Sequence, residues 1–212
     1  MKPTMSLTLI FLVVALATPI LARPDGHVKD SVGRILRPGQ TYHIVPATPE
    51  TGGGLFSNSE EICPLDILQS KNPLDLGLPI KLNSELWFVK EFNDVTIKFE
   101  APNWFLCPEE SKGWRVVYSE EFKKSLVIST GGSSNPSRFQ IHRVEGDAYK
   151  IVYCTNMSPT TCTNVGIFTD LSGVRRLVLT NDEALLVKFQ KARDHEPAKS
   201  DLKTKLRMFP SY

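Results

Sequence analysis

The sequence lacks the motifs that would indicate an enzyme or a metal protein. Its 212 residues contain no H-E-x-x-H, G-x-S-x-G or Walker motif, and its four cysteines form no C-x-x-C pair. Such motifs place a metal, a nucleophile or a phosphate on a defined local structure. The four histidines are scattered along the chain. We therefore expect a protein that is not an enzyme, with no bound metal and no cofactor.

An excess of charge of either sign is also missing. The formal net charge is +2, and removing residues 1–22, whose only charged residue is Lys2, leaves 24 basic and 23 acidic residues. Domains that bind nucleic acid usually carry a strong basic excess. The near balance of charge therefore argues against nucleic acid as a partner.

One long hydrophobic run occurs, and it lies at the N-terminus. Residues 7–21 are almost entirely apolar over 15 positions, between the basic Lys2 and the small Ala22. This layout is typical of a cleaved secretory signal. The run is shorter than the roughly 20 residues of a membrane-spanning helix. We predict a signal peptide at residues 1–22, no membrane association after its removal, and a secreted, extracellular protein, with the vacuole as the alternative.

Secretion changes the interpretation of the cysteines. An even number in an oxidising compartment favours disulfides. Cys154 and Cys162 share one turn-rich segment, so their pairing is the simplest closure, and Cys63 would then pair with Cys107. By the loop-entropy estimate, the disulfide that closes the long loop would stabilise the fold by about 4 kcal/mol, and the one that closes the short loop by about 2.5 kcal/mol. Three pairings remain formally open. A sequon between the last two cysteines makes Asn156 a candidate N-glycosylation site.

Residues 23–193 follow the pattern of a β protein. Short runs rich in Val, Ile, Leu, Phe and Tyr alternate with turn residues, and residues 95–99 alternate strictly between apolar and polar. About eleven short strands with regular turns are typical of a sandwich or a barrel. The strands are expected at residues 41–45, 65–69, 86–90, 95–99, 114–118, 125–128, 138–144, 149–154, 166–169, 175–179 and 185–190.

The segments around these strands complete the domain organisation. Glycine-rich stretches such as residues 52–54 and Gly146 fall between predicted strands, where turns require positive φ. Residues 194–212 are rich in charge and poor in core-forming side chains. They predict a disordered C-terminal tail.

Aromatic and histidine side chains leave alternatives open. Trp87, Trp104 and Trp114 would either pack in the core or rim of the fold, or form a platform for a sugar. His43 and His142 lie in predicted strands, where hydrogen-bonded or exposed histidines are the more common outcome. No Gln-x-Trp motif occurs in the chain, which disfavours a sugar-binding trefoil.

Several segments, in order, resemble the plant Kunitz-type protease inhibitors, the soybean trypsin inhibitor family. They are V-K-D-S-V-G-R-I-L at residues 28–36, G-Q-T-Y-H-I at 39–44, G-G-G-L at 52–55, C-P-L at 63–65 with Gln69, Y-K-I-V-Y-C at 149–154, G-I at 166–167 and R-R-L-V at 175–178. The resemblance covers roughly residues 28–190. It implies an all-β fold, a β-trefoil of twelve strands with a six-stranded barrel, a monomer, and the disulfides Cys63–Cys107 and Cys154–Cys162.

The resemblance also implies a function. Members of this family typically inhibit serine proteases by presenting an exposed loop, without cofactors. In this chain the loop falls on residues 81–88. Counting back from residues 95–99 places the pocket-entering residue at Glu85, with Leu86 after the bond, whereas counting forward from Cys63 places it near Trp87. Lys81 is the basic residue of this stretch.

Two departures from the family pattern shape the expected target. The loop-bracing asparagine of the family is replaced by Pro38, and neither Glu85 nor Trp87 is the basic residue that trypsin requires. Leu86 or Trp87 would suit a chymotrypsin-like pocket. We expect Lys81, Glu85, Leu86 and Trp87 to contact an endopeptidase, a serine protease other than trypsin first and a cysteine protease as the alternative. The competing hypothesis is a non-inhibitory, miraculin-like storage, defence or binding protein.

Overall fold

The computed structural model describes residues 26–57, 65–100, 113–129, 135–155 and 161–192. Within these residues there are twelve β-strands and one short 3-10 helix, η1 (Pro49–Thr51). The strands are β1 (Thr41–Pro46), β2 (Leu55–Ser57), β3 (Leu65–Gln69), β4 (Ile80–Asn83), β5 (Thr96–Phe99), β6 (Trp114–Ser119), β7 (Lys124–Ser129), β8 (Phe139–Glu145), β9 (Ala148–Cys154), β10 (Cys162–Thr169), β11 (Arg175–Thr180) and β12 (Leu186–Lys191).

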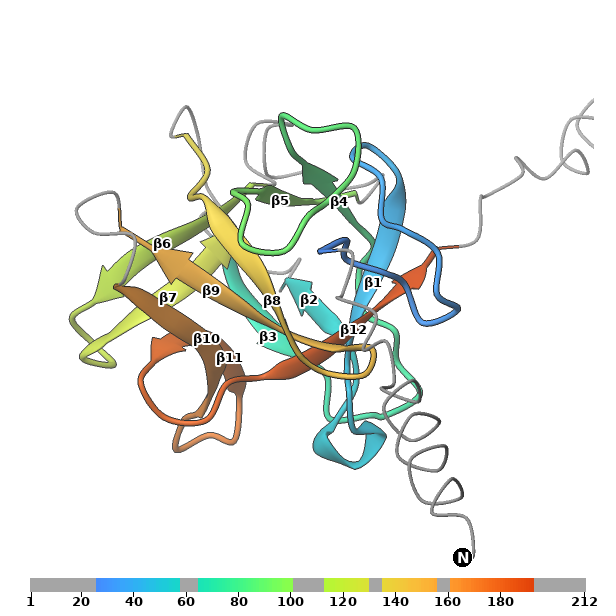
Figure 1. The fold of residues 1–212 in the computed structure, drawn as a ribbon. Helices are drawn as coiled ribbons and strands as arrows, with labels where there is room; N and C mark the ends of the chain where they lie inside the picture. Colours follow the sequence, from blue (N-terminus) through green and yellow to red (C-terminus); the bar gives the residue numbers. More distant parts are fainter. Residues whose placement is uncertain (1–25, 58–64, 101–112, 130–134, 156–160, 193–212) are drawn as a thin grey trace, which may run out of the picture.

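Six of the strands form a closed ring (Figure 1). Strand β1 pairs with β12 and β4, β4 pairs with β5, β8 with β9, and β9 with β12, all antiparallel. The ring closes where Val95, next to β5, forms an antiparallel bridge with Phe139 of β8. Each of these two residues donates its N–H to the carbonyl of the other at 2.8 Å. This ring is the expected six-stranded barrel.

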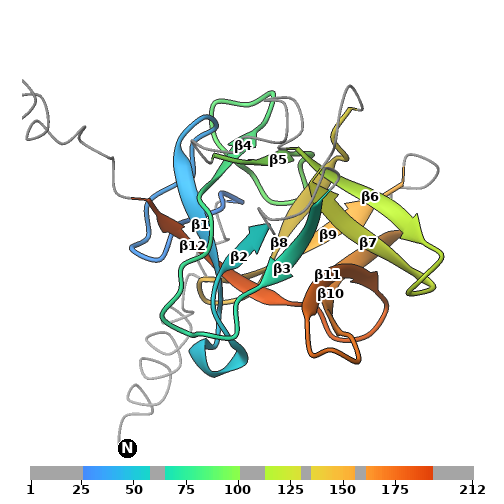
Figure 2. The same ribbon diagram turned by 180° about the vertical axis from the view of Figure 1, so that it is seen from behind.

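The other six strands form three hairpins. These are β2–β3, β6–β7 and β10–β11, and further pairings join β3 to β7, β7 to β11 and β3 to β11 (Figure 2). Because each hairpin contacts the other two, together they form a three-sided cap. A six-stranded barrel with a cap of three hairpins is the β-trefoil that the resemblance implied.

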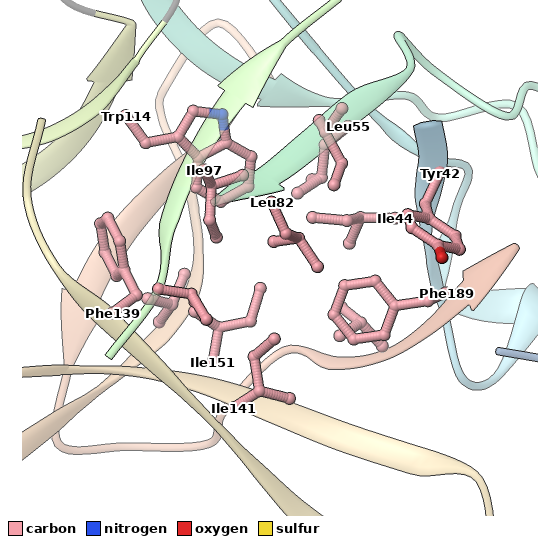
Figure 3. Close-up of a cluster of buried hydrophobic side chains, with 14 of the residues drawn as sticks. Tyr42, Ile44, Leu55, Leu82, Ile97, Trp114, Phe139, Ile141, Ile151 and Phe189 are labelled. Atoms are coloured by element: carbon pink, nitrogen blue, oxygen red, sulfur yellow. The ribbon is translucent and has the colours of Figure 1, made fainter. Parts of the chain in front are cut away.

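Alternating side chains of the barrel strands fill one core (Figure 3). Tyr42 and Ile44 of β1 are 1% exposed, and the polar positions beside them face outward. Trp114, at the start of β6, is fully buried, with its ring 5.7 Å from that of Phe99 and 6.1 Å from that of Phe139. Trp114 is therefore a core residue and not part of a sugar platform.

The structure corrects the predicted strands in one region. Residues 86–90 do not form a strand, because β4 lies earlier, at Ile80–Asn83, and pairs there with β5. The apolar composition of residues 86–90 suggested a strand, but Lys90 forms only an isolated antiparallel bridge with His27, and this pairing does not extend into a strand. The three-residue strand β2 was not predicted.

The glycine triplet at residues 52–54 does more than form a turn. Gly52 has a φ of 122°, as a turn requires. At the next two positions a Cβ atom would lie 2.1 Å from the carbonyl oxygen of Asn72 and 2.0 Å from that of Leu76. Gly53 and Gly54 are therefore required because two backbone segments touch there.

One predicted disulfide is present in the described residues. Cys154 and Cys162 are opposite each other on β9 and β10, with their Cα atoms 4.2 Å apart. Cys63, Cys107, Trp104, Asn156, the signal peptide at residues 1–22 and the tail at 194–212 lie outside the described residues. In the part of the chain that the structure covers, no helix is long and apolar enough to cross a membrane.

Candidate functional site

The connection between β4 and β5 carries highly exposed apolar side chains. Trp87 is 91% exposed and Leu86 is 37% exposed, and Glu85 beside them also faces solvent. The next residue, Phe88, is half-buried, and Val89 is fully buried. We call residues 84–88 the contact tip. From Trp87 to Val89, within three residues, the side chains therefore change from solvent-exposed to fully buried.

The backbone on both sides of the contact tip is held by the segment that precedes β1. On one side the N–H of Gly39 donates to the carbonyl of Leu82 at 3.0 Å. On the other side Val89 accepts from the N–H of Val28 and donates to the carbonyl of Leu36, both at 3.0 Å. Residues 28–39 thus fasten the two ends of the tip.

The Phe88 side chain anchors the tip from within. Its ring centroid lies 5.5 Å from the guanidinium carbon of Arg37 and 5.8 Å from the ring of His27, which it meets edge-on. A guanidinium over an aromatic face is attractive by about 0.5–1 kcal/mol at exposed sites. Arg37 precedes Pro38, the position of the family's asparagine. The contact between Arg37 and Phe88 therefore lies next to the position at which the bracing asparagine is absent.

The second half of the connection is clamped to β8. Arg143 donates from Nε to Oε1 of Glu91 at 2.9 Å, and the Glu91 side chain is only 7% exposed. The same guanidinium donates to the carbonyl oxygens of His27 and Gly146 at 2.9 and 2.7 Å. Because Arg143 joins three separate segments, it fixes the base of the connection on the barrel.

Phe92 shapes the turn within this clamped half. It has a φ of 62°, which is uncommon for a residue with a side chain, and its N–H donates to the carbonyl of Ile141 at 3.2 Å. Its ring centroid lies 4.3 Å from that of His142, with the two rings tilted by 43°. Burial lowers the pKa of His142, and the charge of Lys150 lowers it further. The lowered pKa favours the neutral imidazole of His142 near pH 7, beside the ring of Phe92.

An open hollow of about 600 Å³ lies under the contact tip. Residues 83–86 line one side of it, and residues 92–96 with Arg138 line the other. Asp94 at its rim accepts from Nε2 of Gln140 at 3.1 Å. The tip therefore projects over free space, which leaves room around Glu85 and Leu86.

Three of the four predicted contact residues are consecutive in the sequence and exposed. Glu85, Leu86 and Trp87 all lie in the contact tip. Lys81 does not: it belongs to β4, where its Nζ is 2.9 Å from Oε1 of Glu100. Its charge is therefore directed to a neighbouring carboxylate and away from the tip.

Sequence reasoning missed the residues that hold the tip. Phe88 contacts Arg37 and Glu91 pairs with Arg143, and in both pairs the partner is distant in sequence. Phe92 donates to the equally distant Ile141. No local motif marks these contacts. Among the described residues there is no group of three or more histidine, cysteine, aspartate or glutamate side chains that could hold a metal.

The fold and this connection define a β-trefoil scaffold that presents a short, fastened loop. The family described as Kunitz legume, "Trypsin and protease inhibitor", matches residues 28–191. Kunitz trypsin inhibitor 1 of Arabidopsis thaliana is 82% identical over 212 residues, covering 100% of both chains. The chain belongs to the plant Kunitz (soybean trypsin inhibitor) family, which is a family of protease inhibitors and not of enzymes.

Solved structures agree with this family. Soybean trypsin inhibitor in complex with porcine pancreatic trypsin matches with a TM-score of 0.68 and 30% identity, over 79% of this chain and 99% of that one. A water-soluble chlorophyll protein from Brassica oleracea with chlorophyll b matches with a TM-score of 0.66 and 31% identity, again over 79% and 99%.

Proposed function

We propose that this protein inhibits a serine protease by inserting its contact tip into the active-site cleft of the enzyme. The observation that carries the proposal is the 91% exposed Trp87 on a stretch whose two ends are held by backbone hydrogen bonds. Trypsin inhibition is the named property of the 82% identical relative, and a trypsin complex is among the similar structures. The partner is accordingly an endopeptidase of the serine class.

The physical basis of inhibition is preorganisation. A loop that is already in its bound shape loses little conformational entropy when it docks, so more of the contact energy remains as affinity. Here Gly39 and Val89 fix the backbone at the two ends, and Phe88 fixes a side chain between them. These contacts replace the asparagine that Pro38 cannot supply.

The tip itself favours an apolar specificity pocket. Its exposed side chains are Glu85, Leu86 and Trp87, none of them basic. We propose that Leu86 or Trp87 enters the pocket, and that a chymotrypsin-like enzyme is held more tightly than trypsin. The names of the relatives favour trypsin instead. In that case Lys90, exposed just after the buried Val89, is a candidate basic contact residue close to the tip in sequence.

The deciding experiment titrates the mature protein against trypsin, chymotrypsin, elastase, subtilisin and papain. We expect tight inhibition of a serine protease that falls by about tenfold to a hundredfold in Leu86→Ala or Trp87→Ala, as for a buried hot-spot side chain. Leu74→Ala, which alters an 88% exposed leucine on another connection, is the matched control. Trypsin inhibition lost in Lys90→Ala but kept in both tip variants would overturn the proposed contact.

A second candidate is a non-inhibitory binding protein. The similarity to a chlorophyll protein of the same fold favours it, as does the missing asparagine at Pro38. Lack of inhibition across the whole enzyme panel, with a folded protein, would support this candidate over the first.

We also propose that the protein is secreted as a monomer after cleavage behind Ala22. The Cys154–Cys162 disulfide supports an oxidising destination, since such bonds are rare in the cytosol. N-terminal sequencing of the protein isolated from extracellular fluid and from vacuoles tests both the cleavage site and the destination. A mature chain that still begins at Met1 would contradict the proposal.

A further inference from the structure

A second hollow, of about 450 Å³, opens beside the contact tip. Three cationic side chains line it, Arg34, Arg37 and Lys191, together with one carboxylate, Asp30. We call it the basic hollow. The ring of Phe88 is also part of its wall, so the basic hollow and the contact tip share a side chain. Figure 1 shows the blue segment that precedes β1 running beside the end of β12, which carries Lys191.

Among the described residues that line the basic hollow, the three cations outnumber the single carboxylate of Asp30. In the described part of the chain, none of its three cations forms an ion pair with a carboxylate. Oδ1 of Asp30 accepts instead from the backbone N–H groups of Val32 and Arg34, at 3.1 and 2.8 Å. By contrast, the barrel and cap arginines Arg143 and Arg176 each have a carboxylate partner.

The backbone that carries these cations is well fixed. The turn at residues 30–34 is closed by a hydrogen bond from the N–H of Asp30 to the carbonyl of Arg34 at 2.8 Å. The N–H of Arg37 donates to the hydroxyl of Tyr42 at 3.0 Å, and Lys191 lies opposite Tyr42 in the β1–β12 pair. A charged group entering the basic hollow therefore meets cations on a backbone that needs little reordering.

We propose that the basic hollow is a carboxylate-binding subsite, which holds an acidic side chain of the protease that docks on the contact tip. The proposal rests on the proposed inhibitory function. A guanidinium presents paired N–H donors that match the two oxygens of a carboxylate. An excess of positive charge beside the tip also steers an acidic surface toward it and accelerates association. The subsite adjoins the tip, because Phe88 of the tip lines the basic hollow.

The first test measures carboxylate binding directly and needs no inhibited enzyme. The mature protein is titrated with a tetraglutamate peptide at low ionic strength while the arginine Nε–Hε signals are followed by NMR. We expect saturable shifts at Arg34 and Arg37 and none at Arg115 or Arg175. The shifts disappear in an Arg34→Gln variant that also carries Lys191→Gln. Equal shifts at all arginines, or none at any, would overturn the subsite.

The second test measures association with the inhibited protease. Arg34→Gln combined with Lys191→Gln should lower the association rate constant by about fivefold to tenfold at low salt, and by less than about twofold at 0.5 M salt. The matched control is Arg115→Gln combined with Lys71→Gln, which removes the same charges from β6 and from the β3–β4 connection. Arg37 is left intact because it also contacts Phe88.

The two tests separate the failure of this proposal from the failure of the proposed function. Inhibition with an association rate that is the same in both double variants overturns the subsite and leaves the inhibitor intact. Absence of inhibition overturns the proposed function, and the peptide titration then still decides whether the basic hollow binds carboxylates.

Discussion

The two halves of the β4–β5 connection are built in opposite ways. Residues 84–88 leave Glu85, Leu86 and Trp87 in solvent, whereas residues 89–95 are held by backbone hydrogen bonds, by the Glu91–Arg143 ion pair and by the bridge from Val95 to β8. A recognition loop needs an exposed surface and a fixed shape. Here the first half carries the 91% exposed Trp87, and the second half has most of the fixation, although its Phe92 is also 64% exposed. Stability and binding should therefore respond to different substitutions.

The largest effect on stability is expected when the clamp is broken. In Arg143→Ala, the carboxylate of Glu91, with 7% of its side chain exposed, loses its ion pair, and the carbonyls of His27 and Gly146 lose a donor. We expect a loss of about 3 kcal/mol in the free energy of unfolding, measured by urea denaturation. Lys123→Ala is the control, because its pair with Glu120 has side chains 71% and 78% exposed. That variant should lose less than about 0.5 kcal/mol. Equal losses in the two variants would contradict the role of the clamp.

The next effect separates binding from stability in the tip. Trp87→Ala should weaken inhibition by about thirtyfold, or about 2 kcal/mol, because it removes the most exposed aromatic contact. Its free energy of unfolding should stay within about 0.5 kcal/mol of the parent, as for other surface substitutions. Inhibition constants and urea denaturation on the same preparation check both. A large loss of stability would show that the two halves are not separate.

A smaller effect is expected at Phe88, where the halves meet. Phe88→Leu keeps an apolar side chain but removes the ring that contacts Arg37 and His27. We expect inhibition to weaken by about 1 kcal/mol, chiefly through faster dissociation. Phe122→Leu is the matched control, since that ring also lies under an arginine, Arg176, at 4.5 Å, but on the cap. Weaker inhibition in the control as well would point to a general effect on the fold.

The smallest effect is a change in how the stability of the protein depends on pH, through His142, which packs against the clamped half of the connection. Burial lowers the pKa of His142 in the folded protein below its ordinary value. When the pH falls below that ordinary value, the unfolded chain therefore binds more protons than the folded protein. The stability contribution of neutral His142 is therefore complete above about pH 6.5 and is lost as the pH falls below it. His142→Gln should reduce this pH dependence, measured by urea denaturation between pH 7 and 5. His43→Gln is the companion variant, since burial also lowers the pKa of His43 in β1. An unchanged pH profile in both variants would exclude these histidines as its cause.

Local patterns predicted the parts of the molecule that depend on neighbours in sequence. The alternation at residues 95–99 gives β5, and the paired positions of Cys154 and Cys162 follow from the short turn-rich segment between them. The position of the exposed tip followed from the family resemblance, and the structure places Glu85, Leu86 and Trp87 there together.

Features that depend on distant partners could not be predicted in the same way. The composition of residues 86–90 favoured a strand, and only the pairing of β4 with β5 shows that this segment is a connection. Glu91 and Arg143 are 52 residues apart, so their ion pair has no local signal. The position of Lys81 opposite Lys98, with its Nζ 2.9 Å from Oε1 of Glu100, likewise depends on strand pairing that no local pattern shows.

The fastening at Leu82 and Val89 has a consequence for the exchange of loops. Both residues are fully buried, and their backbone partners, Gly39, Val28 and Leu36, come from outside the connection. The chain between these two points is therefore a replaceable insert whose length and side chains can change while the barrel keeps its register. A single frame of this kind can carry different tips, because the bonds that hold it are made by the backbone at the two ends of the insert.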